Sequence, residues 1–86
     1  MSSRQYDKNY VQSILSFNIL RKMEEQKVTV YALADACEVT STSIKQLIAS
    51  EQFISSRVLA AICNYLDTTP AELFKERENA KTETTS

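Results

Sequence analysis

Four polar side chains in one short segment are of types that hydrogen-bond the edges of nucleic-acid bases. They are Ser41, Thr42, Lys45 and Gln46. A Gln amide pairs with adenine, a Lys ammonium donates to guanine, and Ser or Thr hydroxyls serve several bases. Their spacing places all four on one face of an α-helix. Small polar residues alone are more typical of a solvated helix surface, so the elements around this segment must decide between the two interpretations.

Two residue types that enzymes and cofactor sites commonly use are missing. The chain has no His, the usual general base and commonest metal ligand, and no Gly for a phosphate-binding loop or a nucleophile elbow. Cys37 and Cys63 are too isolated for a disulfide framework or a metal site. We therefore expect no enzyme, metal, cofactor or small-molecule ligand, and two reduced thiols in the core.

Length and composition are typical of one small globular domain. The 86 residues are 43% hydrophobic, and the formal net charge is −1. No apolar run approaches the roughly 18 residues that a membrane span requires, and the N-terminus has no secretory signal. We expect a soluble cytoplasmic protein with a single domain at 1–78 (core 16–76, N-terminal extension 1–15) and a disordered tail at 79–86.

Two helices are predicted around the polar segment. The first, over residues 30–37, has apolar residues at i, i+3, i+4 and i+7: Val30, Leu33, Ala34 and Cys37. Thr29 is its expected N-cap, and Val28 can form a hydrophobic staple with Leu33. The second, over residues 41–49, repeats the pattern, with Thr40 as N-cap and Val39 against Ile44. Its buried residues are expected to be Ile44, Leu47 and Ile48.

The connection between these two helices is short. Only residues 38–40 separate them, which favours two crossed helices at about 90–120°, the helix-turn-helix arrangement. Such a unit needs a small residue where the helices cross, here Ala34, and an apolar shared core. The residues expected in that core are Leu33, Cys37, Val39, Ile44 and Leu47.

Two further helices are predicted after this unit. One follows a loop at 50–55, with Ser55 or Ser56 as N-cap, and its apolar face consists of Leu59, Ile62, Cys63 and Leu66. The other begins with Thr69 as N-cap and Pro70 at the first helical position, and Glu72 completes a capping box. Leu73 and Phe74 are expected to point inward.

The first helix is predicted from its apolar residues, but its start stays open. Phe17, Ile19, Leu20 and Met23 are expected to supply apolar contacts, and the helix ends near Gln26. Upstream lies a further apolar stretch, with Asp7 as a candidate cap: Tyr6, Tyr10, Val11, Ile14 and Leu15. This stretch either lengthens the first helix or forms a short extra one. The fold class expected is therefore all-α, a compact bundle of about five short helices.

The segment from Phe17 to Phe74 resembles the Cro/CI-type (XRE-like) helix-turn-helix domain of phage and bacterial repressors, a lambda-repressor-like fold. The matching pieces are FNILRKMEEQKVT, YALADACEVTSTSIKQLI and VLAAICNYLDTTPAELF. The resemblance implies that 41–49 is the recognition helix, with base contacts from Ser41, Thr42, Lys45 and Gln46. It also implies phosphate contacts from residues around the motif and from the start of the fourth helix: Thr40, Ser50, Ser56, Arg57 and Lys27.

Three features depart from the family pattern. Glu38 stands where the family usually has Gly in a left-handed turn, and Val30 stands where many relatives have a phosphate-binding Gln. The balance of 10 basic against 11 acidic residues is also unusual for a nucleic-acid binder. An N-terminal arm with Arg4 and Lys8 would add positive charge.

Two functions follow from the sequence. The first is a sequence-specific DNA-binding regulator, a repressor of phage, mobile-element or bacterial origin, that binds double-stranded DNA as a homodimer. The alternative is a protein-interaction module, an antirepressor or adaptor with little DNA affinity. In that case the stretch 6–15 would dock on a partner, dimerise, or extend the core. The dimer surface is assigned equally to this stretch and to the last helix with Phe74.

Overall fold

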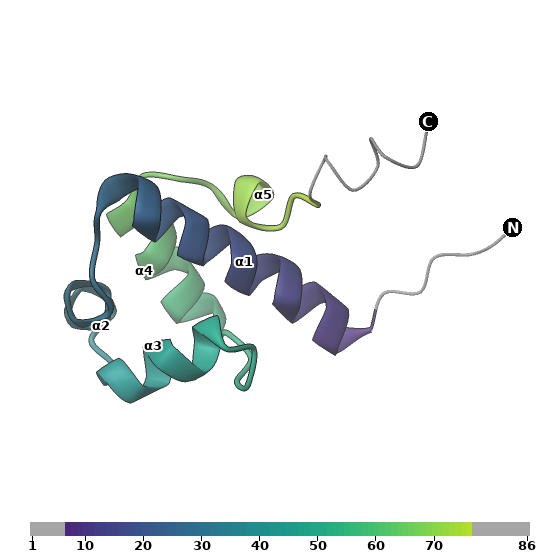
Figure 1. Ribbon diagram of the computed structural model, residues 1–86, viewed down its shortest axis with the longest axis horizontal. Helices are drawn as coiled ribbons and strands as arrows, with labels where there is room; N and C mark the ends of the chain where they lie inside the picture. Colours follow the sequence, from purple (N-terminus) through teal and green to yellow (C-terminus); the bar gives the residue numbers. More distant parts are fainter. Residues whose placement is uncertain (1–6, 77–86) are drawn as a thin grey trace, which may run out of the picture.

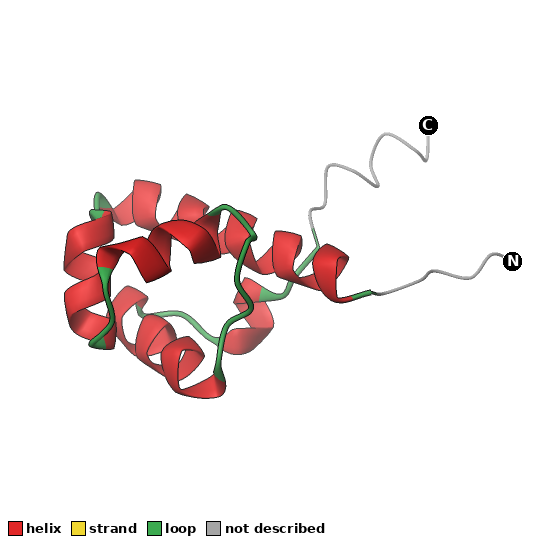
Figure 2. Cartoon of the chain, turned by 90° about the horizontal axis from the view of Figure 1, so that it is seen from below, coloured by secondary structure: helices red, strands yellow, loops and turns green. Residues whose placement is uncertain are grey.

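The computed structural model describes residues 7–76, and within this range the chain forms helices joined by short loops, with no strand (Figures 1 and 2). Its helices are α1 (Lys8–Gln26), α2 (Val30–Cys37), α3 (Ser41–Ile48), α4 (Ser56–Leu66) and α5 (Pro70–Leu73). The prediction of an all-α bundle of five helices is therefore confirmed. Arg4, Tyr6 and the tail at 79–86 lie outside the described residues.

Each helix begins at a side chain that caps its first turn. The residues are Asp7, Thr29, Thr40, Ser55 and Thr69, and each accepts a hydrogen bond from the backbone N–H three positions later. Ser55, and not Ser56, therefore caps α4. Of the two hydrogen bonds of the capping box expected at α5, only the one accepted by the Thr69 side chain is present among the described contacts. The Glu72 N–H donates to Thr69, but the Glu72 carboxylate accepts from the Thr68 hydroxyl and pairs with Lys22 at 3.4 Å.

The α1 helix settles the open question about the N-terminal stretch. It is one helix of 19 residues that starts directly after Asp7, and its N-terminal end projects beyond the bundle (Figures 1 and 2). Leu15, Ile19 and Met23 form its buried apolar stripe. Phe17 and Leu20, also expected to supply apolar contacts, lie outside this stripe and are 39% and 38% exposed. At 100° per residue both lie across the helix from Leu15.

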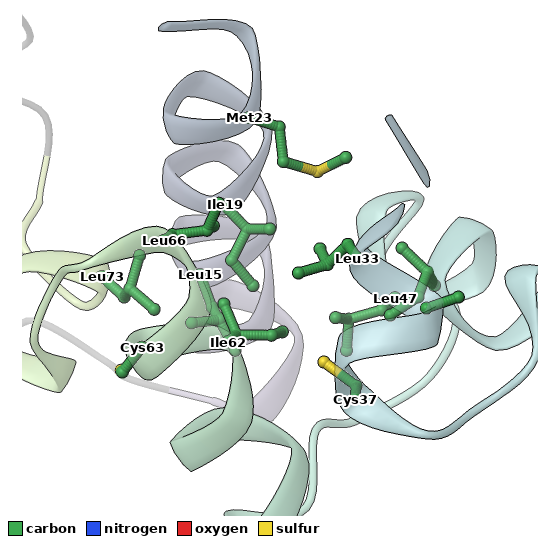
Figure 3. Packing of buried hydrophobic residues seen from close by; sticks show 12 residues of the cluster. Leu15, Ile19, Met23, Leu33, Cys37, Leu47, Ile62, Cys63, Leu66 and Leu73 are labelled. Atoms are coloured by element: carbon green, nitrogen blue, oxygen red, sulfur yellow. The ribbon is translucent and has the colours of Figure 1, made fainter. Parts of the chain in front are cut away.

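The core is one cluster contributed by all five helices (Figure 3). It contains Leu15, Ile19, Met23, Leu33, Ala34, Cys37, Ile44, Leu47, Ile62, Cys63, Leu66 and Leu73. Both cysteines are buried free thiols, as predicted. The prediction for Phe74 was wrong: it caps the short α5 with its side chain exposed, because only Leu73 faces the cluster. Ile48 and Leu59 lie at the edge of the core and are half-buried.

The last carbonyl groups of the short helices accept hydrogen bonds from side chains of other helices. Helix ends leave such carbonyls without intrahelical partners. Three donors come from α1: Ser16 to the Leu47 carbonyl, Gln26 to that of Leu66, and Asn18 to that of Leu73. The fourth donor is Arg57 of α4, whose Nη1 lies 3.4 Å from the Cys37 carbonyl. Polar residues of α1 thus hold the ends of three helices.

Candidate nucleic-acid interface

The unit of α2 and α3 has the crossed arrangement that its short connection predicts. Figure 1 shows α2 end-on while α3 runs across the view, along the edge of the bundle opposite α5. The turn requires a left-handed residue, and Glu38 adopts φ 59° and ψ 42° there. Ala34 is 4% exposed where the helices pack, and Leu33, Cys37, Ile44 and Leu47 are at most 2% exposed. The predicted core of the unit is confirmed, with Val39 half-buried against it.

The buried and the exposed residues of α3 lie on different sides of the helix. Ile44 and Leu47 face the core, whereas Thr42, Lys45 and Gln46 are exposed. Ser41, also predicted to contact bases, is the first residue of α3 and is half-buried. The structure therefore brings the four predicted residues together on one helix, and three of them are exposed.

Three of the residues predicted to contact phosphate lie at the N-termini of α3 and α4. The Thr40 hydroxyl oxygen accepts from the Ser43 N–H at 3.1 Å, which leaves its O–H available to donate. Ser56 and Arg57 are the first two residues of α4, and both are exposed. A helix N-terminus favours anions, so this region suits a phosphate group.

Arg57 also has a structural contact. One of its five N–H donors reaches the Cys37 carbonyl at the end of α2, which orients the guanidinium toward the helix-turn-helix unit. Burial raises the pKa of the Cys37 thiol, and the positive charge of Arg57 lowers it in part. The Arg57 guanidinium is thus close enough to the buried Cys37 thiol to stabilise its deprotonated form.

Ser50 and Lys27 are placed less favourably for phosphate. Both are exposed and left-handed, with φ 65° and 58° respectively. The Ser50 hydroxyl donates inward to the Ser16 hydroxyl at 3.1 Å, so contact with a phosphate would require that bond to break. Lys27 is the C-cap of α1, two residues before the N-cap of α2.

Lys8, the described residue of the predicted N-terminal arm, lies near the loop between α3 and α4. It is the first residue of α1, and its Nζ lies 5.3 Å from the ring centroid of Phe53. This contact brings a cation from the start of the chain to the loop at 50–55, which lies between Ser50 and Ser56, two of the residues implied to contact phosphate. Arg4, its predicted companion, lies outside the described residues.

Sequence reasoning overlooked Tyr31 on α2. Its ring lies 5.5 Å from the Nζ of Lys45, and its side chain is 66% exposed. The available signal was its position between Val30 and Leu33, outside the apolar i, i+3, i+4, i+7 stripe of α2. An aromatic residue off the buried stripe of a short helix must lie at the surface.

The described residues contain no group of three or more His, Cys, Asp or Glu side chains able to hold a metal ion. No helix between residues 7 and 76 is long and apolar enough to cross a membrane.

Comparison with known proteins agrees with this geometry. Residues 18–76 match the model of a family described as the Cro/C1-type HTH DNA-binding domain. No curated protein matches in sequence. A solved structure, the hypothetical transcription factor NHTF from Neisseria, has the same fold with a TM-score of 0.75, at 12% identity over 96% of this chain and 95% of that one. Because the family match spans most of the chain, the protein belongs to the Cro/C1-type helix-turn-helix DNA-binding domain family.

Proposed function

We propose that the protein is a sequence-specific transcriptional repressor that places α3 in the major groove of DNA. The observation that carries this proposal is the division of α3, with Ile44 and Leu47 in the core and Thr42, Lys45 and Gln46 exposed. Both ends of this helix are held, by the Thr40 cap and by the Ser16 hydroxyl on the Leu47 carbonyl. A rigid, exposed recognition helix is what base readout requires.

The proposal assigns two sets of contacts. Base edges are contacted by Ser41, Thr42, Lys45 and Gln46, and phosphates by Thr40, Ser50, Ser56, Arg57 and Lys27. Arg4 and Lys8 form an accessory arm. The protein would bind an operator in a phage, mobile-element or bacterial genome, in the cytoplasm and without a cofactor. The domain limits, with a core at 16–76, remain a prediction.

The small number of cations favours binding as a homodimer. Only Lys and Arg neutralise phosphates and release counterions, and two or three such charged contacts per subunit give a log–log salt slope of only about −2 to −3 for a monomer on duplex DNA. A dimer doubles the slope and the electrostatic free energy. Its half-sites would form an inverted repeat with centres about 10–10.5 base pairs apart, or a multiple of that. The dimer surface is either the N-terminal part of α1 or α5 with Phe74.

The first experiment is fluorescence anisotropy of a labelled random-sequence duplex, titrated with the protein at low and then moderate salt. Binding at micromolar protein that weakens steeply with salt is the expected result, because nonspecific affinity is electrostatic. Selection of an operator from a random pool follows. Absence of binding even at low salt would contradict the repressor proposal.

One observation favours a second function, a protein-interaction module. The side of α1 opposite the core exposes apolar side chains, with Tyr10, Phe17 and Leu20 at 40%, 39% and 38%. A partner or a second copy would cover this side. The substitution Leu20→Glu should then abolish association in sedimentation experiments while the melting temperature stays the same. Under this function Gln46→Ala and Arg57→Ala would leave partner binding unchanged.

A further inference from the structure

Tyr31 is an exposed aromatic residue that does not contribute to the hydrophobic core. It is the second residue of α2, and at 66% it has the largest exposed fraction among the large hydrophobic side chains exposed in residues 7–76. The buried residues of α2 are Leu33, Ala34 and Cys37. Because most of the ring remains in water, it contributes little burial free energy to the fold.

The ring of Tyr31 has a partner on the recognition helix. The Nζ of Lys45 lies 5.5 Å from its centroid, within the approximately 6 Å range of a cation–π contact. The two residues belong to the two helices of the helix-turn-helix unit, 14 positions apart in the chain. The contact therefore joins the N-terminal turn of α2 to the exposed side of α3.

A cation–π contact suits a lysine that must also bind DNA. The ring face attracts the ammonium electrostatically and accepts no conventional hydrogen bond, so the N–H donors stay available for a guanine edge or a phosphate oxygen. A lysine with a freely rotating side chain loses conformational entropy when it is immobilised on a ligand. The ring restricts that motion before DNA arrives, which reduces the loss on binding.

We propose that Tyr31 is a positioning residue of the DNA-binding surface, whose ring holds the Lys45 ammonium in place for contact with DNA. This inference rests on the proposed function. It also gives α2 a role at the surface where Val30 lacks the phosphate-binding group that many relatives carry.

The test compares four variants with the wild-type chain on the same duplex at the same salt: Tyr31→Ala, Tyr31→Phe, Lys45→Met and the double variant Tyr31→Ala/Lys45→Met. We expect Tyr31→Ala to weaken affinity about two- to five-fold, the size of an exposed cation–π contact. Tyr31→Phe keeps the ring and should bind as the wild type does. The double variant should bind no more weakly than Lys45→Met, because Tyr31 acts through Lys45.

Two controls separate positioning from loss of structure. Tyr65 is also an exposed tyrosine, 45% exposed near the C-terminal end of α4, and Tyr65→Ala should leave DNA affinity unchanged. The melting temperature of Tyr31→Ala should fall by only a few degrees, because an exposed cation–π contact contributes about 0.5–1 kcal/mol to the fold. A readout without DNA is the proton NMR signal of the Lys45 ε-methylene, which the ring should shift upfield and Tyr31→Ala should restore.

The outcomes distinguish this inference from the proposed function. Wild-type protein that binds no duplex at low salt overturns the proposed function and this inference with it. Wild-type protein that binds, while Tyr31→Ala binds equally well, overturns the inference alone. So does a neutral Lys45→Met, a double variant in which the two losses add, or a Tyr31→Phe that is as weak as Tyr31→Ala.

Discussion

The Ser16 hydroxyl donates a hydrogen bond of 2.6 Å to the backbone carbonyl of Leu47, and this bond joins the middle of α1 to the last turn of α3. Ser16 is 3% exposed. Its oxygen in turn accepts from the Gln12 amide at 3.3 Å and from the Ser50 hydroxyl at 3.1 Å. A buried network of this kind fixes both the position and the orientation of α3, because each member needs the others to satisfy its polar groups.

Removal of the Ser16 hydroxyl should therefore destabilise the fold. The Leu47 carbonyl keeps the bond from the Ser50 N–H. The variant Ser16→Ala loses the bond that Ser16 donates to this carbonyl and the two that its oxygen accepts, from the Gln12 amide and from the Ser50 hydroxyl. We expect the free energy of unfolding to fall by about 1–2 kcal/mol, measured by urea denaturation. Ser13→Ala on the exposed side of α1 is the matched control and should change it by less than about 0.5 kcal/mol. Equal stability of the two variants would contradict this account.

Substitutions of proposed base contacts and of proposed phosphate contacts should differ in how the loss of affinity depends on the DNA sequence. Gln46→Ala removes a proposed base contact, so affinity should fall about 5- to 100-fold on a selected operator and little on random DNA. Arg57→Ala removes a proposed phosphate contact, so affinity should fall on both duplexes, with a shallower salt slope by about 1.

Arg57 needs its own control, since its guanidinium also donates to the Cys37 carbonyl. Arg57→Lys retains the charge and should keep most of the affinity for random DNA. The melting temperature of each variant shows whether lost affinity reflects a lost fold. An Arg57→Ala variant that weakens binding to the operator alone would be inconsistent with a phosphate contact.

Replacing Glu38, which has a left-handed backbone conformation, by Gly should stabilise the protein. With φ at 59°, a side chain with a Cβ is strained there, and Gly is not. Glu38→Gly should raise the free energy of unfolding by about 0.5–1 kcal/mol after the greater entropy of Gly in the unfolded chain is counted. Ala36→Gly, in the last turn of α2, should lower it by up to about 1 kcal/mol. Calorimetric melting temperatures that move in the same direction for both variants would refute the explanation.

The buried thiols should make the protein less stable at high pH. Burial raises the pKa of Cys37 and of Cys63 above the ordinary value of 9.0, and for Cys37 the Arg57 charge opposes part of that rise. The native state therefore retains thiol protons that the unfolded state loses above about pH 9. The free energy of unfolding is unaffected by these groups below that pH. It should fall above it by at most about 1.4 kcal/mol per pH unit for each thiol.

Urea denaturation between pH 7 and 10.5 measures this dependence. The comparison is with the Cys37→Ala/Cys63→Ala variant, which removes both thiols and leaves every other ionisable group in place. That variant should be less stable at pH 7 and should show a flatter decline above pH 9. The same decline in both proteins would assign the effect to other groups.

The helices were predictable because their signals are local. Thr29, Thr40 and Thr69 each cap the helix predicted to follow them, and the apolar spacing located α2 and α3 to within one residue. The wrong prediction for Phe74 and the exposure of Phe17 and Leu20 share one cause. The hydrophobicity of a residue does not show which side of its helix packs against the other helices. In α1 and α5 the packed side consists of other residues, and these three side chains lie outside it.

The sequence by itself determined the helix-turn-helix: two capped amphipathic helices, three connecting residues and a small Ala34 leave little choice of geometry. The tertiary structure alone decided which polar groups serve the fold and which face solvent. Ser16 and Asn18 look like surface residues in the sequence, yet they are buried and donate to carbonyls 31 and 55 residues away. The approach of Lys45 to Tyr31 is also a result of how α2 and α3 cross. Such contacts depend on where helix ends meet in space, whereas spacing along the chain encodes only the periodicity and caps of each helix.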